Sequence, residues 1–268
     1  MGALDGRVAL VTGAGRLRGI GRATAVALAD MGADVVVTGT GRDPSTFPED
    51  EKQVGWQDVE STAEQVRRHG RRALTWAGDI SRAEEVQGLV DVSMQAFGRL
   101  DVLVNNAAYP RGNDRVPVPA LDEAVWRKVL EIKLTGAFLL CKGIVPIMMQ
   151  QGWGRIINLS SVAGKRGVPN TAAYCTANFG IQGFTQALAM EVARHGITVN
   201  AVCPGTIDTA RMDVLGRGET WQRQLESIPM GRAASDEEVA GLIAFLCSPA
   251  AAYLTGQSIN IDGGVVMW

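Results

Sequence analysis

Residues 8–21 of the chain read Val8-Ala9-Leu10-Val11-Thr12-Gly13-Ala14-Gly15-Arg16-Leu17-Arg18-Gly19-Ile20-Gly21. Four apolar residues, enough for a short buried strand, lead directly into a turn with four glycines, and a helical pattern over Arg22–Met31 follows. Glycine allows a tight turn and lets backbone N–H groups approach a pyrophosphate, whose charge the helix N-terminus attracts. Glycines also occur in turns for conformational reasons alone. The placement between a first strand and a first helix favours nucleotide binding.

Six further apolar runs continue the alternation of short strands with longer amphipathic segments. They are Val35–Thr38, Ala73–Trp76, Val102–Val104, Arg155–Leu159, Ile197–Val202 and Ser258–Ile261. Continuously apolar strands separated by helices indicate a parallel sheet that is covered on both faces. No linker or change of composition divides residues 1–268. We therefore predict a single α/β domain of the Rossmann type, a doubly wound parallel sheet of about seven strands with helices on both faces.

The composition is that of an ordinary soluble globular protein. Hydrophobic residues make up 46% of the 268 residues, and a net charge of −2 gives no sign of a nucleic-acid or anionic-membrane partner. The first residues lack a signal pattern, and no uncharged apolar run is long enough to span a bilayer. The spacing of Cys141, Cys175, Cys203 and Cys247 indicates reduced thiols, and two histidines make a histidine metal site unexpected. We expect a cytoplasmic protein without a metal.

Two connections are long enough to carry function. Gly39–Gly55 contains two prolines and several charges, and it is long for a strand-to-helix turn. Residues 206–232, which follow Pro204-Gly205, contain Arg211 and Trp221 and are a candidate lid over a substrate.

The chain from Gly6 to Gly264 resembles the classical short-chain dehydrogenase/reductase family. Thr12–Gly21 is similar to the family pattern TGxxxGxG, with two extra residues between the first two motif glycines. Ser161 stands 13 positions before Tyr174, which is the family's spacing for its serine and tyrosine. Further matches are Asp79 after the third strand, Asn105-Asn106-Ala107-Ala108, Pro204-Gly205 and Asp262-Gly263-Gly264.

The resemblance implies a nicotinamide dinucleotide as cofactor. An acid at the end of the second strand would bind the ribose 2′-hydroxyl and disfavour a 2′-phosphate, but Thr38-Gly39-Thr40-Gly41-Arg42 contains none. Arg16, Arg18 and Arg42 could instead bind a phosphate. The alternative is that these arginines are solvated loop residues. We favour NADP(H), with NAD(H) as the alternative. The expected cofactor residues are Gly13, Gly15, Arg16, Arg18, Gly19, Ile20, Gly21, Thr40, Arg42, Asp79, Ile80, Asn106, Ala107, Pro204, Gly205, Ile207 and Thr209.

The resemblance also implies that Tyr174 is the catalytic acid/base and that Ser161 orients a substrate carbonyl. The family's Tyr-x-x-x-Lys reads Tyr174-Cys175-Thr176-Ala177-Asn178 here, and Lys133 stands where the family has an active-site asparagine. A free tyrosine has a pKa near 10, which a nearby cation lowers by roughly 1–3 units. We therefore interpret the change as a compensating exchange. Lys133 supplies the charge, and Asn178 supplies hydrogen bonds to a ribose or a water.

Other interpretations of these residues remain open. Both exchanged positions could have drifted, which would leave a nucleotide-binding relative without turnover or one with a non-redox activity such as isomerisation. Lys165 is a second candidate cation, although a residue there is more often an exposed rim group. Tyr109 and Trp153 are candidates for a substrate pocket, with core packing as the alternative for Trp153.

The expected partner is a small-molecule ketone or secondary alcohol. Because the family usually forms tetramers, we expect a homotetramer, and the apolar tail Val265–Trp268 is consistent with burial against a neighbouring subunit. A flexible exposed tail is the alternative.

Overall fold

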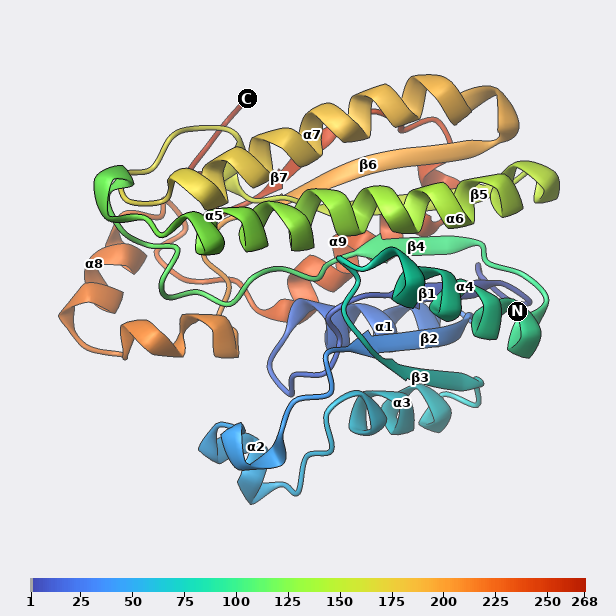
Figure 1. Ribbon diagram of the computed structural model, residues 1–268, viewed down its shortest axis with the longest axis horizontal. Coiled ribbons are helices and arrows are strands. Elements are labelled where there is room, and N and C mark those ends of the chain that lie inside the picture. Colours follow the sequence, from blue (N-terminus) through green and yellow to red (C-terminus); the bar gives the residue numbers. More distant parts are fainter. Residues whose placement is uncertain (1) are drawn as a thin grey trace.

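The predicted α/β architecture is confirmed by a computed structural model that describes residues 2–268 (Figure 1). All seven strands are parallel, in the order β3-β2-β1-β4-β5-β6-β7. Each lies at a predicted apolar run, with ends that differ by at most two residues. The strands are β1 (Val8–Val11), β2 (Asp34–Gly39), β3 (Ala73–Ala77), β4 (Val102–Asn105), β5 (Gly154–Leu159), β6 (Ile197–Pro204) and β7 (Ser258–Ile261).

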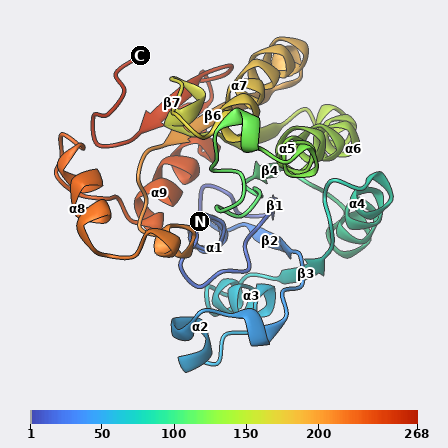
Figure 2. The same cartoon turned by 60° about the vertical axis from the view of Figure 1, so that its left-hand side comes forward.

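Helices cover both faces of the sheet (Figure 2). One layer contains α1, α3 and α9, and the other contains α4, α6 and α7. The smaller α2, α5 and α8 lie in connections beyond the carboxyl ends of strands. The bounds are α1 (Ile20–Asp30), α2 (Glu49–Gln53), α3 (Val59–Arg68), α4 (Ala83–Phe97), α5 (Glu123–Leu130), α6 (Gly136–Gln151), α7 (Ala172–Val192), α8 (Glu219–Glu226) and α9 (Asp236–Cys247).

The first strand shows why a continuously apolar run is needed. Successive side chains of a strand point to opposite faces, so Val8 and Leu10 join the core under α4, α6 and α7. Ala9 and Val11 join the core under α1, α3 and α9. All four are at most 1% exposed, because neither face of a doubly covered sheet meets water.

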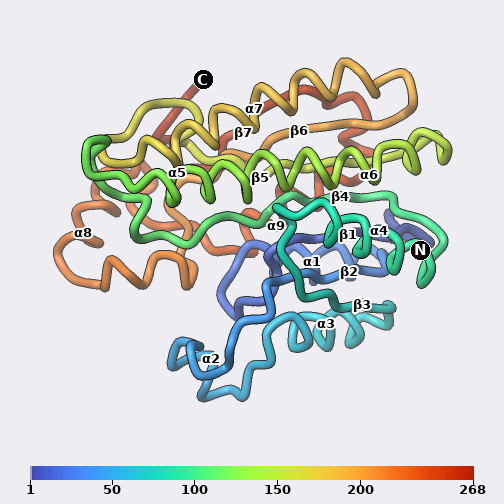
Figure 3. Tube along the Cα trace, viewed as in Figure 1, coloured from blue at the N-terminus to red at the C-terminus, as the bar shows by residue number. Residues whose placement is uncertain are grey.

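The two long connections contain helical turns. Residues 39–55 form the 3-10 turn η1 (Pro44–Thr46) and α2, and residues 206–232 form the 3-10 helix η6 (Ala210–Leu215) and α8. The tube in Figure 3 shows that both connections project away from the sheet. The candidate lid is therefore an ordered segment and not an open loop.

The segment Glu123–Gln151, which joins α5 to α6, is long and apolar enough to cross a membrane by composition. Its residues Leu140, Ile144 and Met148 are fully buried in the core under the sheet. This is the burial expected of a helix that covers a sheet, so composition alone carries no membrane assignment here.

Candidate active site

The glycine-rich turn between β1 and α1 is tightly packed against neighbouring backbone. A Cβ at Gly13, whose φ is +66°, would lie 2.9 Å from the Cα of Ala107, and a Cβ at Gly21 would lie 2.5 Å from the carbonyl oxygen of Gly13. At Gly15 a Cβ would lie 1.9 Å from Oδ1 of Asp58. The fold itself therefore requires glycine at these three positions.

Gly19 differs from the other glycines of the turn. The nearest atom to a Cβ there would be the Cβ of Arg16 at 3.4 Å, an ordinary contact distance. The protein thus leaves space beside this backbone at the start of α1. The N–H of Gly19 donates to Oδ2 of Asp236 at 2.8 Å, so the helix N-terminus already faces a carboxylate.

The end of β4 holds the turn in place. The side-chain amide of Asn106 donates to the carbonyl oxygens of Thr12 at 2.7 Å and Gly13 at 3.0 Å. The hydroxyl of Thr12 in turn accepts from the backbone N–H groups of Asn106 and Ala107, each at 3.0 Å. Because all of its bonds go to the turn, the Asn106 side chain positions the glycine backbone.

Arg42, after β2, is fully engaged with protein groups. Its Nε donates to Asp58 at 3.0 Å, its Nη1 to Glu51 at 2.8 Å, and its Nη2 to the carbonyl oxygen of Gly15 at 2.8 Å. Glu51 is fully buried and Asp58 nearly so. The same Gly15 oxygen accepts from Nε1 of Trp56 at 2.7 Å. The connection 39–58 therefore packs on the glycine turn, and the guanidinium of Arg42 is paired with carboxylates.

Arg18, which lies within the glycine turn, is a second arginine that is paired with carboxylates. Arg18 donates to Asp50 at 2.7 Å and also to Asp213 of η6, with Asp208 at 3.7 Å. It thereby joins the glycine turn to α2 and to the candidate lid. Arg16 differs, because within residues 2–268 it forms no hydrogen bond or ion pair. Burial first, and then the charge of Arg42, lower the pKa of its half-buried guanidinium.

Asp79, one of the expected cofactor residues, lies after β3. Burial of its carboxylate opposes ionisation, but the ammonium of Lys128 at 2.7 Å and the hydroxyl of Ser81 at 2.6 Å outweigh it and lower the pKa to about 2. Asp79 is thus a fixed anion at the rim of the sheet.

The remaining predicted cofactor residues lie at the start of α1 and at or beyond the carboxyl ends of β2, β3 and β6. Thr40 is exposed, and Ile80 packs on Gly136 at the start of α6, where a Cβ would lie 2.9 Å from the isoleucine. Gly205 donates to the carbonyl oxygen of Ile261 at 3.0 Å. The positions that complete this group are Ile20 at the start of α1, Pro204 at the end of β6, the buried Ile207 and Thr209, which caps η6.

The turn that begins at Ser161, beyond the carboxyl end of β5, packs against α7, which contains Tyr174. Ser161 is buried and begins a 3-10 turn, where its Oγ accepts from the N–H of Ala163 at 3.1 Å. Tyr174 lies in the first turn of α7. The neighbouring Ser160 joins the two elements, because its hydroxyl donates to the carbonyl oxygen of Asn178 at 2.9 Å.

Asn178 is 1% exposed, one helical turn after Tyr174. Its Nδ2 donates to the carbonyl oxygen of Tyr174 at 2.8 Å, while its Oδ1 is buried without a hydrogen-bond partner. A buried acceptor without a donor costs free energy, so this atom is suited to a hydroxyl that reaches it from outside the chain.

Lys133 lies in a single π-helical turn (Glu131–Thr135) between α5 and α6, which packs against α7. Insertions of this kind are frequent at functional sites. Lys133 is 7% exposed, and within residues 2–268 its ammonium has no ion-pair partner. Burial first, and then the charge of Arg211, lower the pKa of Lys133 to about 7.

Three arginines near Tyr174 were not predicted as site residues. The Cζ of Arg115 lies 3.9 Å from the centre of the tyrosine ring, and that of Arg211 lies 5.4 Å from it. Arg111 lies in the same loop as Arg115, and its Nη1 is 4.0 Å from Sδ of Met212. No local sequence pattern marks these residues, but all three follow the carboxyl ends of β4 and β6.

The positions of Trp153 and Lys165 in the fold bear on the alternatives that the sequence left open for them. Trp153 precedes β5 and stacks on Arg7 and Arg155 at the opposite end of this strand from Ser161, which favours packing over a role beside Ser161. Lys165 donates to the carbonyl oxygen of Ser258 at 2.9 Å and is half-buried, so it is not a free rim group.

Comparison with known proteins places this fold and site in a family. A family model described as enoyl-(acyl carrier protein) reductase matches residues 13–266. A 3-oxoacyl-(acyl-carrier-protein) reductase from Synechocystis sp. is 41% identical over the whole of both chains. The chain belongs to the short-chain dehydrogenase/reductase family. The corresponding reductase from Aquifex aeolicus is 40% identical over 98% of each chain.

A solved short-chain dehydrogenase structure agrees with this assignment. The crystal structure of a protein described as a short-chain alcohol dehydrogenase, from Sinorhizobium meliloti, has a TM-score of 0.86 and 38% identity, and the match covers 98% of this chain and 97% of that one. The present chain is thus an oxidoreductase of the short-chain dehydrogenase class, which acts on carbonyl or alcohol groups with a nicotinamide cofactor.

Proposed function

We propose that this short-chain dehydrogenase interconverts a ketone and a secondary alcohol with Tyr174 as acid/base and Ser161 as the group that orients the carbonyl. The observation that carries the proposal is the packing of the turn that begins at Ser161 against α7, whose first turn holds Tyr174 under the guanidinium of Arg115. When bound, the nicotinamide supplies the hydride for reduction or accepts it in oxidation. In reduction the Tyr174 hydroxyl gives its proton to the substrate oxygen, which leaves a phenolate.

The residues fit a dinucleotide on two counts. Gly19 leaves space beside its backbone, while its N–H donates to Asp236, and the buried Oδ1 of Asn178 accepts no hydrogen bond from the chain. A ribose hydroxyl is the donor that this acceptor would take in the proposed exchange. Asn178 in this role binds and orients but adds no charge.

Lys133 is proposed as the cation that stabilises the Tyr174 phenolate. Because its pKa is about 7, its charge is present below neutral pH and is lost as the pH rises. Arg211 keeps its charge at every pH at which the enzyme is active. The catalytic contribution of Lys133 should therefore fade above pH 7.

The exchange is tested by three variants. Lys133→Ala should lower kcat by about 100-fold or more, because a cation near a phenol is worth roughly 1–3 pKa units, while NADPH affinity, followed by calorimetry, tests cofactor binding separately. Lys133→Asn combined with Asn178→Lys restores the family arrangement and should retain activity. Asn178→Lys alone crowds two ammonium groups and should impair it. An unchanged rate for Lys133→Ala contradicts the exchange.

NADP(H) is the proposed cofactor, and Arg16 is the proposed partner of its 2′-phosphate. Arg18 and Arg42 are paired with carboxylates, whereas Arg16 is not. Arg16→Ala should raise the KM for NADPH about tenfold and leave the KM for NADH nearly unchanged, since one charge-assisted contact contributes about this much. An equal loss for both cofactors would assign Arg16 to the shared pyrophosphate.

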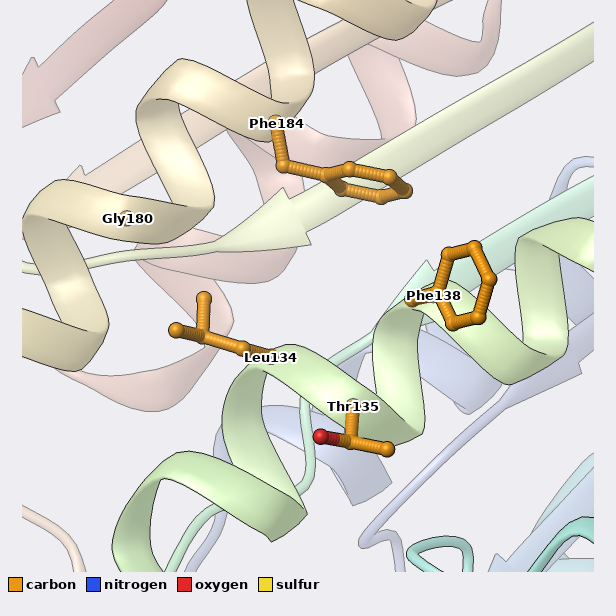
Figure 4. Close-up of a pocket in the computed structure, with 5 residues that line it drawn as sticks. All are labelled: Leu134, Thr135, Phe138, Gly180 and Phe184. Carbon is orange, nitrogen blue, oxygen red and sulfur yellow. The ribbon is translucent and has the colours of Figure 1, made fainter.

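We further propose a cytoplasmic homotetramer. The outer face of α6 and α7 exposes Phe138, Phe179 and Met190. It contains a hollow of about 310 Å³ lined by Leu134, Thr135, Phe138, Gly180 and Phe184, in which the two phenylalanines flank the gap between the helices (Figure 4). At the carboxyl tail, Met267 and Trp268 are also exposed. Apolar faces of this kind favour association.

The lid and the competing function have their own tests. The ion pairs of Arg18 with Asp208 and Asp213 support a lid at residues 206–232 that closes over the site. A non-redox or regulatory relative remains the alternative function. Oxidation of NADPH, followed by its absorbance across a panel of ketones, separates the two, because tight NADPH binding without oxidation favours the alternative.

A further inference from the structure

Two separate loops place arginines over the ring of Tyr174. Arg115 comes from the connection after β4, and its Cζ lies 3.9 Å from the ring centre. Arg211 comes from η6 in the lid, with its Cζ at 5.4 Å on the same ring. Arg211 also donates to the carbonyl oxygen of Tyr109 at 2.5 Å, which ties the lid to the first loop. The cationic cluster Arg111, Arg115 and Arg211 therefore borders the atoms at which reaction occurs.

The protein supplies too little negative charge for this cationic cluster. Asp114, which is fully buried, lies 3.3 Å from Nε of Arg115. It is the one carboxylate that pairs with the cluster within residues 2–268. Nη2 of Arg211 is buried without a hydrogen-bond partner. Burial first, and then the neighbouring arginines, lower the pKa of Arg111.

Like charges held together in a half-buried site cost free energy unless an anion joins them. The proposed redox step does not use three guanidinium groups, since one cation suffices to stabilise a phenolate. Guanidinium groups match a carboxylate in a planar, two-bond geometry that an ammonium cannot provide. The excess charge therefore indicates a ligand with its own negative group.

We propose, on the basis of the proposed reductase function, that the substrate is an oxo acid whose free carboxylate binds to Arg115 and Arg211. Because both guanidinium groups lie against the ring that carries the reacting hydroxyl, the carboxylate is one or two carbons from the reacting carbonyl. The product is then a hydroxy acid. A substrate in which a thioester replaces the carboxylate would leave the cluster without its anion.

The experiment compares acetoacetate with its methyl ester, which carries the same ketone without the charge. The wild-type kcat/KM should be about 100-fold higher for the acid, because two charge-assisted hydrogen bonds each contribute about tenfold. Arg211→Met and Arg115→Met should each bring this ratio below about ten. Arg67→Met, at an exposed arginine on α3 outside the lid and the site, is the matched control and should keep the ratio.

A binding measurement that needs no turnover accompanies the kinetics. Malonate should bind the NADPH complex of the wild type in calorimetry and should bind Arg211→Met at least about tenfold more weakly. If ester and acid are reduced equally and malonate does not bind, the oxo-acid proposal is overturned and the reductase function stands. If malonate binds through Arg211 but no ketone is reduced, the anion site stands and the reductase function is overturned.

Discussion

Replacement of Lys133 by methionine should stabilise the protein while it removes the proposed catalytic cation. Lys133 is 7% exposed, and its ammonium has a pKa of about 7, against 10.5 for the free side chain. At pH 7 and below, both folded and unfolded chains bind the proton to a large extent, and burial of the charge opposes folding. Between pH 7 and 10.5 the unfolded chain binds more protons, so stability rises with pH in this window.

The size of the effect follows from the pKa difference. The buried charge costs about 4 kcal/mol at pH 7 and about 2 kcal/mol at pH 9, as an upper limit. Methionine keeps the unbranched apolar stem and removes the charge. Lys133→Met should therefore raise the free energy of unfolding by up to these amounts, with the larger gain at the lower pH.

Urea denaturation of wild type and variant at pH 7 and pH 9 measures this gain. Lys142→Met, at an exposed position of α6, is the control and should change stability little at either pH. A Lys133→Met protein that is less stable than the wild type, or a gain that is larger at pH 9, would refute the reasoning. Either result would mean that the ammonium finds a partner or water in the folded protein.

Further predictions concern the turn, the lid and the helix face. Gly15→Ala should lower stability by about 2 kcal/mol in urea denaturation, because its Cβ would meet Asp58 at 1.9 Å. Gly19→Ala should melt normally but bind NADPH more weakly in calorimetry, since only the cofactor would approach its Cβ. Arg18→Met should make trypsin cleave residues 206–232 several-fold faster, because the lid loses its ion pairs to the glycine turn. Phe138→Glu should shift the sedimentation coefficient toward that of a smaller species.

The fold was predictable because its signals are local. A run such as Val8–Val11 can be buried on both faces only in a covered parallel sheet, and Gly13 and Gly21 mark the turn that follows. The spacing of Ser161 and Tyr174 contributed to the family resemblance, which implied their roles. The helical turns within residues 39–55 and 206–232 were not visible, since short polar helices are stabilised by their contacts with the rest of the chain.

The site was predictable only in part. The sequence shows that Arg16, Arg18 and Arg42 lie close to a nucleotide turn, but not which of them are already paired. Glu51 and Asp58, which neutralise Arg42, look like ordinary surface acids in the sequence. Whether an arginine is already paired depends on the carboxylates that lie near it in space. Those carboxylates come from other elements of the fold.

The sequence by itself determined the sheet and the glycine turn, because periodicity and glycine spacing are properties of the chain alone, while the proposed exchange of Lys133 and Asn178 came from the resemblance to the family. Tertiary structure decided what these groups can do. It buries Lys133 deeply enough to bring its pKa to about 7. It also gathers Arg115 and Arg211, which are 96 positions apart in the sequence, on one tyrosine ring. Burial and convergence depend on packing between distant segments, which no local pattern encodes.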